Sequence, residues 1–168
     1  KKMFIRYSLP QIVRRCYMST SKDQTPTNIL DQRPEDSLFS KFVNKEIALD
    51  TVFENEHVLA FKDINPVATT HILIIPKEPI GGLSDLTNTS EGEEVSPKNA
   101  WKTSTNREKS RAESLSELLL ASAEVAKKVG IDKSGYRIVI NDGKHGQQSI
   151  RWLHLHLLGG EQLKWPPC

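Results

Sequence analysis

Residues 152–158, which read Trp-Leu-His-Leu-His-Leu-Leu, constrain the fold of this chain more than any other segment. Successive side chains of a β-strand point to opposite faces, so the leucines at 153, 155 and 157 share one face, and Trp152, His154 and His156 share the other. Burying the leucine face against a helix fixes the register. The two imidazoles then lie about 7 Å apart along a rigid element. Such a pair suits metal binding or nucleophilic and acid–base chemistry.

The loop directly before this strand is suited to binding an anion. Residues 141–149 read Asn-Asp-Gly-Lys-His-Gly-Gln-Gln-Ser. Glycines allow backbone N–H groups to turn toward an anion. Ser149 adds a hydroxyl donor and Lys144 a nearby positive charge. The loop therefore predicts a phosphate site next to the two histidines.

The segments before the loop predict a small sheet with a short helix. Residues 35–43 place aromatic side chains at helical spacing after Pro34, which predicts a short helix. Residues 48–54 and 57–62 are rich in β-forming residues and predict a hairpin. Residues 71–75 predict a third strand that ends at Pro76, residues 136–140 a fourth, and residues 150–158 the last.

A long helix is predicted over residues 114–129. Leu115, Leu118, Leu119 and Val125 follow the helical period, and Ser114 with a glutamate three residues later forms a capping box. Gly130 is expected to end the helix. The order of helix, three strands, long helix and two strands predicts an α+β domain with a mostly antiparallel sheet.

Two segments are not expected to belong to the core. Residues 1–30 form a basic tail without an acidic residue before Asp23, which is typical of a mitochondrial transit peptide. The alternatives are a disordered tail or vector residues before Met3, with a cytoplasmic location. Residues of about 87–113 are almost all polar and predict a surface insertion within a domain that spans residues 31–168.

Composition excludes several classes of protein. The net charge of +2 argues against a dedicated DNA-binding domain, which usually has a pronounced basic face. No apolar run approaches the ~20 residues of a membrane-spanning helix. The two cysteines are too few for a disulfide scaffold and lack metal-ligand spacing.

Taken together, the motifs resemble the histidine triad (HIT) nucleotide-binding family. The resemblance is carried by residues 63–66 (Asp-Ile-Asn-Pro), 70–77 (Thr-His-Ile-Leu-Ile-Ile-Pro-Lys), Asn141-x-Gly143, Gln148-Ser149 and 153–160 (Leu-His-Leu-His-Leu-Leu-Gly-Gly). The ending Trp165-Pro166-Pro167 is similar to the Hint branch, the purine nucleoside phosphoramidases. The resemblance implies the HIT fold, a five-stranded mostly antiparallel sheet with one long and one short helix, with the sheet extended across a homodimer. It implies a purine mononucleotide pocket, no cofactor, no metal, and neither nucleic acid nor membrane as a partner.

The resemblance also implies residue roles. His154 falls at the nucleophile, which would attack the α-phosphorus of a nucleoside phosphoramidate or an acyl-adenylate and release AMP or GMP through a nucleotidyl-histidine. The implied catalytic residues are His154, His156, His71 and Ser149. The implied nucleotide-binding residues are Asp63, Ile64, Asn141, Gly146, Gln148, Ser149, His154, His156 and Trp165. Asp63 is alternatively only a turn residue before Asn65-Pro66. Gln147 occupies the family's usual second glycine.

The main departure from the family pattern is Trp152, which stands where the first triad histidine is expected. Indole donates one hydrogen bond and cannot act as a base. We expect strand alternation to place the indole beside His154, where it replaces the packing of the imidazole or crowds the site. Retained but reduced activity is the favoured expectation, and Trp152→His is then expected to raise turnover.

Three other readings are open. His154 and His156 with His71 or His145 could form a zinc site. The protein could bind purine nucleotides without turning them over, as a scaffold. It could also be a dinucleoside polyphosphate hydrolase of the related Fhit branch, which the Trp165-Pro166-Pro167 ending argues against.

Overall fold

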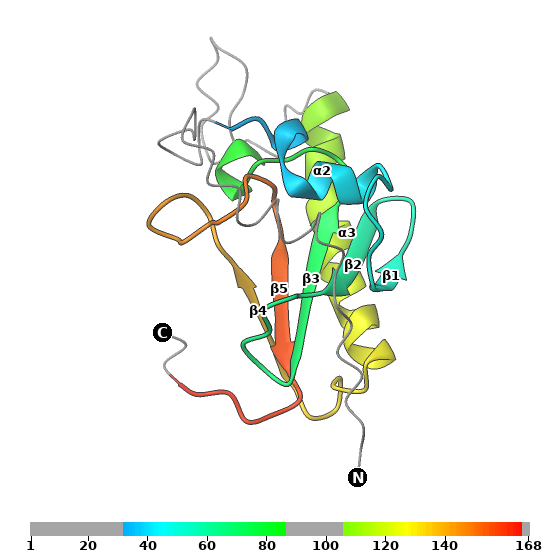
Figure 1. Cartoon of the computed structure of the whole chain (residues 1–168), viewed down its shortest axis with the longest axis vertical. Coiled ribbons are helices and arrows are strands. Elements are labelled where there is room, and N and C mark those ends of the chain that lie inside the picture. Colours follow the sequence, from blue (N-terminus) through cyan, green and yellow to red (C-terminus); the bar gives the residue numbers. More distant parts are fainter. Residues whose placement is uncertain (1–31, 87–105, 166–168) are drawn as a thin grey trace.

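The five strands form one antiparallel sheet. The computed structural model describes residues 32–86 and 106–165. Within these residues the strand order is β1-β2-β3-β5-β4 (Figure 1). The strands are β1 (Thr51–Glu54), β2 (Val58–Lys62), β3 (Thr70–Pro76), β4 (Tyr136–Ile140) and β5 (Leu155–Gly159). The predicted α+β class and five-stranded antiparallel sheet are confirmed.

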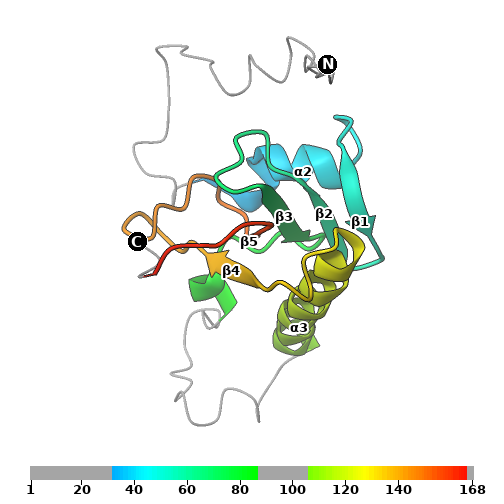
Figure 2. The same ribbon diagram turned by 90° about the horizontal axis from the view of Figure 1, so that it is seen from below.

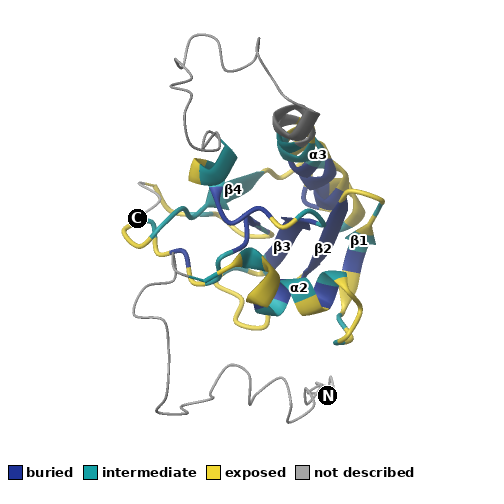
Figure 3. Ribbon diagram, turned by 90° about the horizontal axis from the view of Figure 1, so that it is seen from above, coloured by how far each residue is buried: buried dark blue, intermediate teal, exposed yellow. Residues whose placement is uncertain are grey.

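The helices cover opposite faces of this sheet, as Figures 2 and 3 show. On one face lies α2 (Leu38–Val43), preceded by the short 3-10 helix η2 (Pro34–Asp36). Ser37 separates the two, and its hydroxyl accepts a hydrogen bond from the Ser40 N–H at the start of α2. On the other face lies α3 (Asn106–Lys128), and a second 3-10 helix, η3 (Leu83–Leu86), follows β3. None of the helices in the described ranges is long and apolar enough to cross a membrane.

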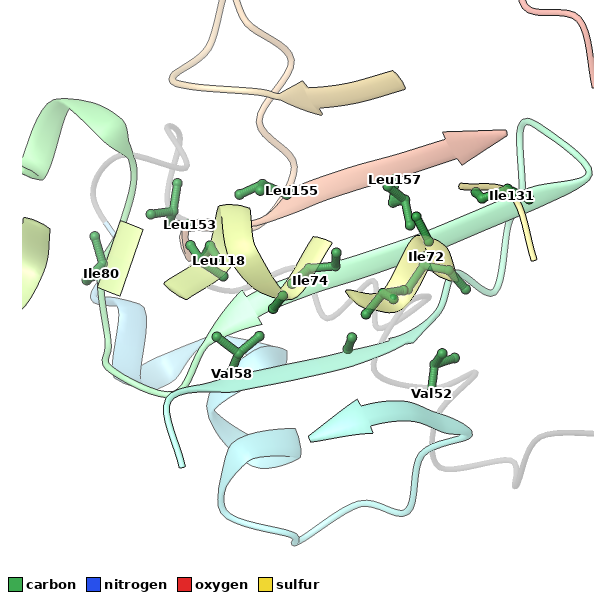
Figure 4. Close-up of a cluster of buried hydrophobic side chains, with 14 residues drawn as sticks. Val52, Val58, Ile72, Ile74, Ile80, Leu118, Ile131, Leu153, Leu155 and Leu157 are labelled. Carbon is green, nitrogen blue, oxygen red and sulfur yellow. The ribbon is translucent and has the colours of Figure 1, made fainter. Parts of the chain in front are cut away.

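The main core lies between α3 and the sheet. Side chains from the strands and from α3 meet there, as Figure 4 shows for Val58, Ile74, Leu118, Leu155 and Leu157. The last two are the leucines of the histidine strand, and both are fully buried. The predicted burial of the leucine face against the long helix is therefore confirmed. The other face of β5, which carries His156, consequently points toward α2.

A second, aromatic core lies on the α2 face. It contains Phe39, Phe42, Leu59, Phe61, Leu73, Ile75 and Trp152. Phe39 and Phe42 both pack edge-on against Phe61 of β2, with ring centroids 5.6 and 5.3 Å away. Because both faces of β3 are covered, its sequence is an unbroken apolar run after His71 rather than an alternating one.

The long helix begins earlier than its apolar pattern predicts. It starts at Asn106, so residues 106–113, which we assigned to the polar insertion, form its first turns. The predicted capping box is wrong, since Ser114 lies inside the helix and its hydroxyl donates to Glu78 at 2.9 Å. Leu119 is 48% exposed rather than buried. The predicted stop is confirmed, because Gly130 has a φ of +77°, a conformation that favours glycine.

The last strand is shorter than predicted. It begins at Leu155, not at residue 150. Residues 148–153 instead contact the segment that follows β3, where the Leu153 N–H donates to the Ile80 carbonyl at 2.6 Å. The basic segment 1–30 and residues 87–105 of the insertion lie outside the described residues.

Candidate active site

The three histidines of the motifs lie together on the α2 face of the sheet. His71 on β3 and His156 on β5 come from neighbouring strands, and their ring centroids are 5.1 Å apart. His154 lies one residue before β5, with its ring centroid 5.0 Å from that of His156. The sheet therefore brings together the residues that the sequence placed in one site.

His154 is held in one tautomer by the main chain. Its Nδ1 lies 2.6 Å from the carbonyl oxygen of Trp152. A carbonyl oxygen only accepts hydrogen bonds, so Nδ1 carries the proton and Nε2 carries the lone pair. The imidazole is 3% exposed, and burial lowers its pKa while the Trp152 carbonyl opposes that shift. His154 is therefore a neutral imidazole with an available ring nitrogen.

His71 and His156 form a second ordered unit. The Val67 N–H donates to His71 Nδ1 at 3.3 Å, and His71 Nε2 lies 2.8 Å from His156 Nδ1. This order of donors leaves the proton of neutral His156 on Nε2. Burial, with the neighbouring His154 and His71 adding to it, lowers the pKa of His156 to about 4. Burial also lowers the pKa of His71, against the attraction of Asp63.

Trp152 packs on the α2 face of the sheet, which is the face that alternation predicted for it, although it does not belong to the strand. Because β5 begins only at Leu155, Trp152 lies outside the strand. Its indole is 2% exposed in the aromatic core, and the indole N–H donates to the Pro76 carbonyl at 2.9 Å. What reaches His154 is the main-chain carbonyl of residue 152. The hydrogen bond to the nucleophile candidate therefore needs no histidine side chain at this position.

A pocket adjoins the histidines. About 460 Å³ of space, partly open to solvent, is lined by Leu38, Phe39, Phe42, Ile47, Ala48, Leu49, Phe61, Lys62, Asp63, Ile64 and Leu73. Phe39 links the pocket to the nucleophile candidate, because its ring also packs edge-on against His154 at 5.5 Å. An apolar, aromatic slot with a few polar groups at one end is the usual form of a small-molecule site. Its aromatic lining suits a flat heterocycle.

Asp63 stands at the end of this pocket with its two oxygens in different surroundings. Oδ1 accepts the Asn65 N–H at 2.7 Å, which is the turn role that we kept open. Oδ2 lies 3.5 Å from His71 Nε2. Ile64 is next to it and is 45% exposed. The turn bond uses one oxygen and leaves the other directed at the histidines.

The loop 141–149 is shaped by its own polar side chains. The Asn141 amide donates to the Gly146 carbonyl. The Gln148 amide oxygen accepts the Gly143 N–H at 2.9 Å, and its nitrogen donates to the carbonyls of Gly81 and Ile150 at 2.6 and 3.0 Å. Gln148 thus shapes the loop with the polar atoms of its side chain, and its contact with a nucleotide stays a prediction. Ser149 is exposed.

Two loop positions explain the preference for glycine. A Cβ on Gly146 would lie 2.3 Å from the Asp142 carbonyl oxygen, which no side chain tolerates. Gln147, where the family usually has glycine, has a φ of 57°. This left-handed conformation is strained for a residue with a side chain.

Asp63, His71 and His156 could in principle hold a metal ion, since they offer ligand atoms within 4.8 Å of one another. His71 Nε2 and His156 Nδ1, however, are 2.8 Å apart and share a hydrogen bond. Two nitrogens that each lie about 2.0–2.1 Å from a tetrahedral zinc ion would be farther apart, about 3.4 Å. The donor set as folded does not fit zinc. The predicted zinc set combined His154 and His156 with His71 or the exposed His145, and neither His154 nor His145 belongs to this cluster.

Sequence reasoning missed the contributions of main chain and aromatic lining. The Trp152 carbonyl and the Val67 N–H fix the two tautomers, and no side-chain pattern reports them. Phe39 and Phe61 were visible as aromatic residues, but not as the walls of a pocket. Trp165, assigned to nucleotide binding, is 83% exposed.

Comparisons with known proteins agree with this geometry. Residues 44–163 match the model of the HIT domain. The 14 kDa zinc-binding protein of Zea mays is 43% identical over 148 residues, which are 88% of this chain and 98% of that protein. Adenylylsulfatase HINT1 of Arabidopsis thaliana is 42% identical over 136 residues, 80% of this chain and 79% of that protein. The crystal structure of a HIT family hydrolase from Legionella pneumophila Philadelphia 1 is 36% identical, with a TM-score of 0.62 and coverage of 79% of this chain and 100% of that one. The chain belongs to the HIT domain family.

Proposed function

We propose that this protein is a nucleotide-binding hydrolase that cleaves the P–N bond of purine nucleoside 5′-phosphoramidates and releases AMP or GMP. The observation that carries the proposal is the 2.6 Å contact between His154 Nδ1 and the Trp152 carbonyl. It leaves a neutral, buried ring nitrogen beside a pocket that suits a purine. This is the state in which an imidazole acts as a nucleophile.

The reaction has two displacements at phosphorus. In the first, the lone pair of His154 Nε2 attacks the α-phosphorus, a P–Nε2 bond forms, and the P–N bond to the amine breaks. The amine leaves with a proton. In the second, water attacks the same phosphorus, the P–Nε2 bond breaks, and the nucleoside monophosphate departs as His154 recovers its neutral form. Covalent catalysis of this kind divides one difficult step into two easier ones.

The proton for the leaving amine is assigned to His156. The hydrogen bond from His71 leaves a proton on Nε2 of His156. His156 lies next to the nucleophile, and the negative phosphate of the substrate favours its doubly protonated form, which gives a proton to the amine and becomes neutral. In the second step the attacking water gives a proton to His156, so each turnover restores the starting state. His71 supports this role by fixing the tautomer of His156.

Recognition of the nucleotide is divided between pocket and loop. The aromatic slot at Phe39 and Phe61 takes the base, and Asp63 at its end accepts hydrogen bonds from the ribose hydroxyls. Backbone N–H groups of the loop around Gly146 and the hydroxyl of Ser149 face the phosphate. The base and ribose assignments rest on the pocket lining, whereas the phosphate contacts are carried over from the family motif, since the Gln147 and Gln148 N–H groups bond within the loop.

The relatives support a hydrolase and broaden the range of leaving groups. One relative at 42% identity is named an adenylylsulfatase, and a solved structure at 36% identity is that of a HIT family hydrolase. Attack at the α-phosphorus is the same step whether an amine, a carboxylate or a sulfate leaves. Acyl-adenylates therefore form a second substrate class of the proposal.

The alternative is a nucleotide-binding protein without turnover, which the replacement of the first triad histidine by Trp152 motivated. This replacement is a weaker argument against catalysis than it was in the sequence, because the hydrogen-bond partner of His154 is a main-chain carbonyl, which any residue at position 152 supplies. We therefore favour the enzyme. We also propose that the protein forms a homodimer. The edge strand β4 and the exposed Trp165 would form the interface between the two copies. Mitochondrial import through residues 1–30 stays a prediction.

The decisive experiment incubates the purified protein with adenosine 5′-phosphoramidate and follows AMP release by chromatography. The proposal expects turnover, together with a covalent adenylyl-protein that acid quench traps. Binding of AMP without release of AMP from the phosphoramidate would instead establish the binding protein. Light scattering of the same sample measures the mass and tests the dimer.

A further inference from the structure

The segment that carries the partner of His154 is held by contacts outside the sheet. Trp152 precedes β5, so no strand ladder fixes its carbonyl. The segment is instead attached at several points to residues 76–85, which comprise the last residue of β3 and the residues after it. The indole of Trp152 bonds to Pro76, the Leu153 N–H to Ile80, and the Gln148 amide to Gly81. The position of the carbonyl therefore depends on how well this second segment holds the first.

The charged attachment in this set is made by Arg151. Its Nη2 lies 3.1 and 3.0 Å from the two carboxylate oxygens of Asp85. The two side chains are 17% and 21% exposed, so the ion pair is largely removed from solvent. Screening by water and salt is weak for such a pair, and its geometry is well defined. Asp85 belongs to η3, and its own carbonyl accepts a hydrogen bond from Arg111 of α3 at 3.0 Å.

Arg151 also stands at the middle of a tight turn. The Trp152 N–H donates to the Ile150 carbonyl at 2.8 Å, which closes a three-residue turn around Arg151. A side chain anchored at the middle of this turn fixes the orientation of the peptide that follows. The Trp152 carbonyl, which receives the proton of His154, belongs to the next peptide along the chain, and the Leu153 N–H of that peptide donates to the Ile80 carbonyl.

We propose that Arg151, through its ion pair with Asp85, is a positioning residue for the nucleophile His154. The ion pair holds the turn, the turn holds the Trp152 carbonyl, and the carbonyl holds the imidazole with Nε2 directed at the substrate. Arg151 itself touches no reacting atom. The kinetic part of this inference rests on the proposed hydrolase function, whereas the part that concerns the tautomer of His154 does not.

The chemistry of the contact suggests a graded set of variants. One nitrogen of Arg151 serves both oxygens, and its Nε is buried without a hydrogen-bond partner in the described residues. A lysine ammonium can make the same single-nitrogen contact, so Arg151→Lys should preserve the function. Arg151→Met keeps a long apolar chain and removes the charge. Arg33→Met is the matched control, since Arg33 pairs with Asp36 at 2.9 Å in an exposed position away from the site.

The test measures steady-state kinetics with adenosine 5′-phosphoramidate and the tautomer of His154 by nitrogen-15 NMR of the imidazole. For Arg151→Met we expect kcat to fall about 10-fold with KM changed less than about 3-fold, as for a misplaced catalytic group. We also expect the single Nδ1-protonated state to become a mixture. Arg151→Lys should restore both, and Arg33→Met should change neither.

The outcomes separate the two proposals. An Arg151→Met protein with the wild-type tautomer of His154 overturns the positioning role, whatever its rate. If Arg151→Met does not fold, Asp85→Asn carries the same test with little change of volume. If the wild-type protein shows no turnover, the proposed hydrolase function fails, and the NMR comparison still decides whether Arg151 orders His154.

Discussion

The imidazole of His154 and the carbonyl of Trp152 are joined by a hydrogen bond of 2.6 Å, two residues apart in the chain and just outside the sheet. Through this contact the main chain sets the tautomer of the nucleophile. The Trp152 side chain meanwhile bonds elsewhere, to Pro76. Residue 152 therefore acts on the site through an atom that substitution of its side chain does not remove.

Substitution of His154 by alanine should abolish turnover, because it removes the atom that forms the bond to phosphorus. We expect a loss of at least about 1000-fold in kcat, the scale on which removal of a nucleophile acts. AMP binding should be largely intact, since the pocket side chains remain. Release of AMP and calorimetric titration with AMP measure the two effects. His57→Ala, in an exposed turn, is the control, and turnover by His154→Ala equal to that of the parent would remove His154 from its role.

Two substitutions of Asp63 separate its turn bond from its charge. Asp63→Asn keeps an oxygen for the Asn65 N–H and removes the carboxylate, whereas Asp63→Ala removes both. Each should weaken AMP binding by about 1–3 kcal/mol, the range for a hydrogen bond to a charged group. Only the alanine variant should also lower the thermal stability. Calorimetry with AMP and thermal unfolding measure these effects. Unchanged affinity for AMP in both variants would reduce Asp63 to a turn residue.

Gln147→Gly should stabilise the protein by about 0.5–1 kcal/mol. A left-handed conformation costs a residue with a side chain about 1–2 kcal/mol, and part of the gain is lost to the greater freedom of glycine when unfolded. Gln147 has a φ of 57°, whereas Gln162 has no positive φ. Gln162→Gly is therefore the matched control and should be neutral or destabilising. Urea unfolding gives both values, and a loss of stability in Gln147→Gly would contradict the strain.

Acid should destabilise the fold between about pH 6.5 and pH 4. The pKa of His156 is lowered to about 4 by burial and by its histidine neighbours, and burial lowers the pKa of His154 and His71 as well. The unfolded chain takes up these protons below the ordinary pKa of about 6.5, whereas the native protein does not. Stability is therefore full above about pH 6.5 and falls as pH decreases toward the native pKa values.

Urea midpoints measured from pH 7.5 to 4.5 test this dependence. The His156→Asn variant removes one of the groups and should show a smaller change over the same interval. A midpoint that stayed constant or rose on acidification would show that the histidines are not held neutral. The proposed nucleophile should correspondingly keep its activity below pH 6.5, until His154 takes up a proton.

Much of the fold could be predicted because local patterns and long-range packing agree. The strand at Tyr136–Ile140 has the predicted bounds, and the leucines of the histidine strand are buried against α3. The start of α3 was missed because residues 106–113 carry no apolar period, although most of them are good helix formers. The helix propensities of these residues, used in place of the hydrophobic period, would have predicted that the helix includes them.

The site was predictable in its side chains and not in its main chain. His71, His154 and His156 meet as the motifs imply. The start of β5 could not be read from the sequence, because the Leu153 N–H bonds to the Ile80 carbonyl and the Trp152 N–H to the Ile150 carbonyl rather than to a neighbouring strand. The alternation of faces nevertheless continues before the strand, because Trp152 lies in the aromatic core and Leu153 in the main core.

The structure changes the expected effect of Trp152→His. The gain in turnover expected from the sequence assumed that a missing imidazole weakened catalysis. Residue 152 instead supplies a carbonyl to His154, and its side chain supplies an N–H to Pro76. An imidazole can make the latter bond, so we now expect kcat within about 3-fold of the parent.

The smaller ring of the histidine leaves a cavity, which should lower the stability of Trp152→His by about 2–4 kcal/mol. Trp152→Phe keeps most of the volume and loses the N–H, and it should reduce kcat more than Trp152→His does. Steady-state kinetics and urea unfolding of the two variants decide the point, since a faster Trp152→His enzyme would show that the imidazole itself takes part in the reaction.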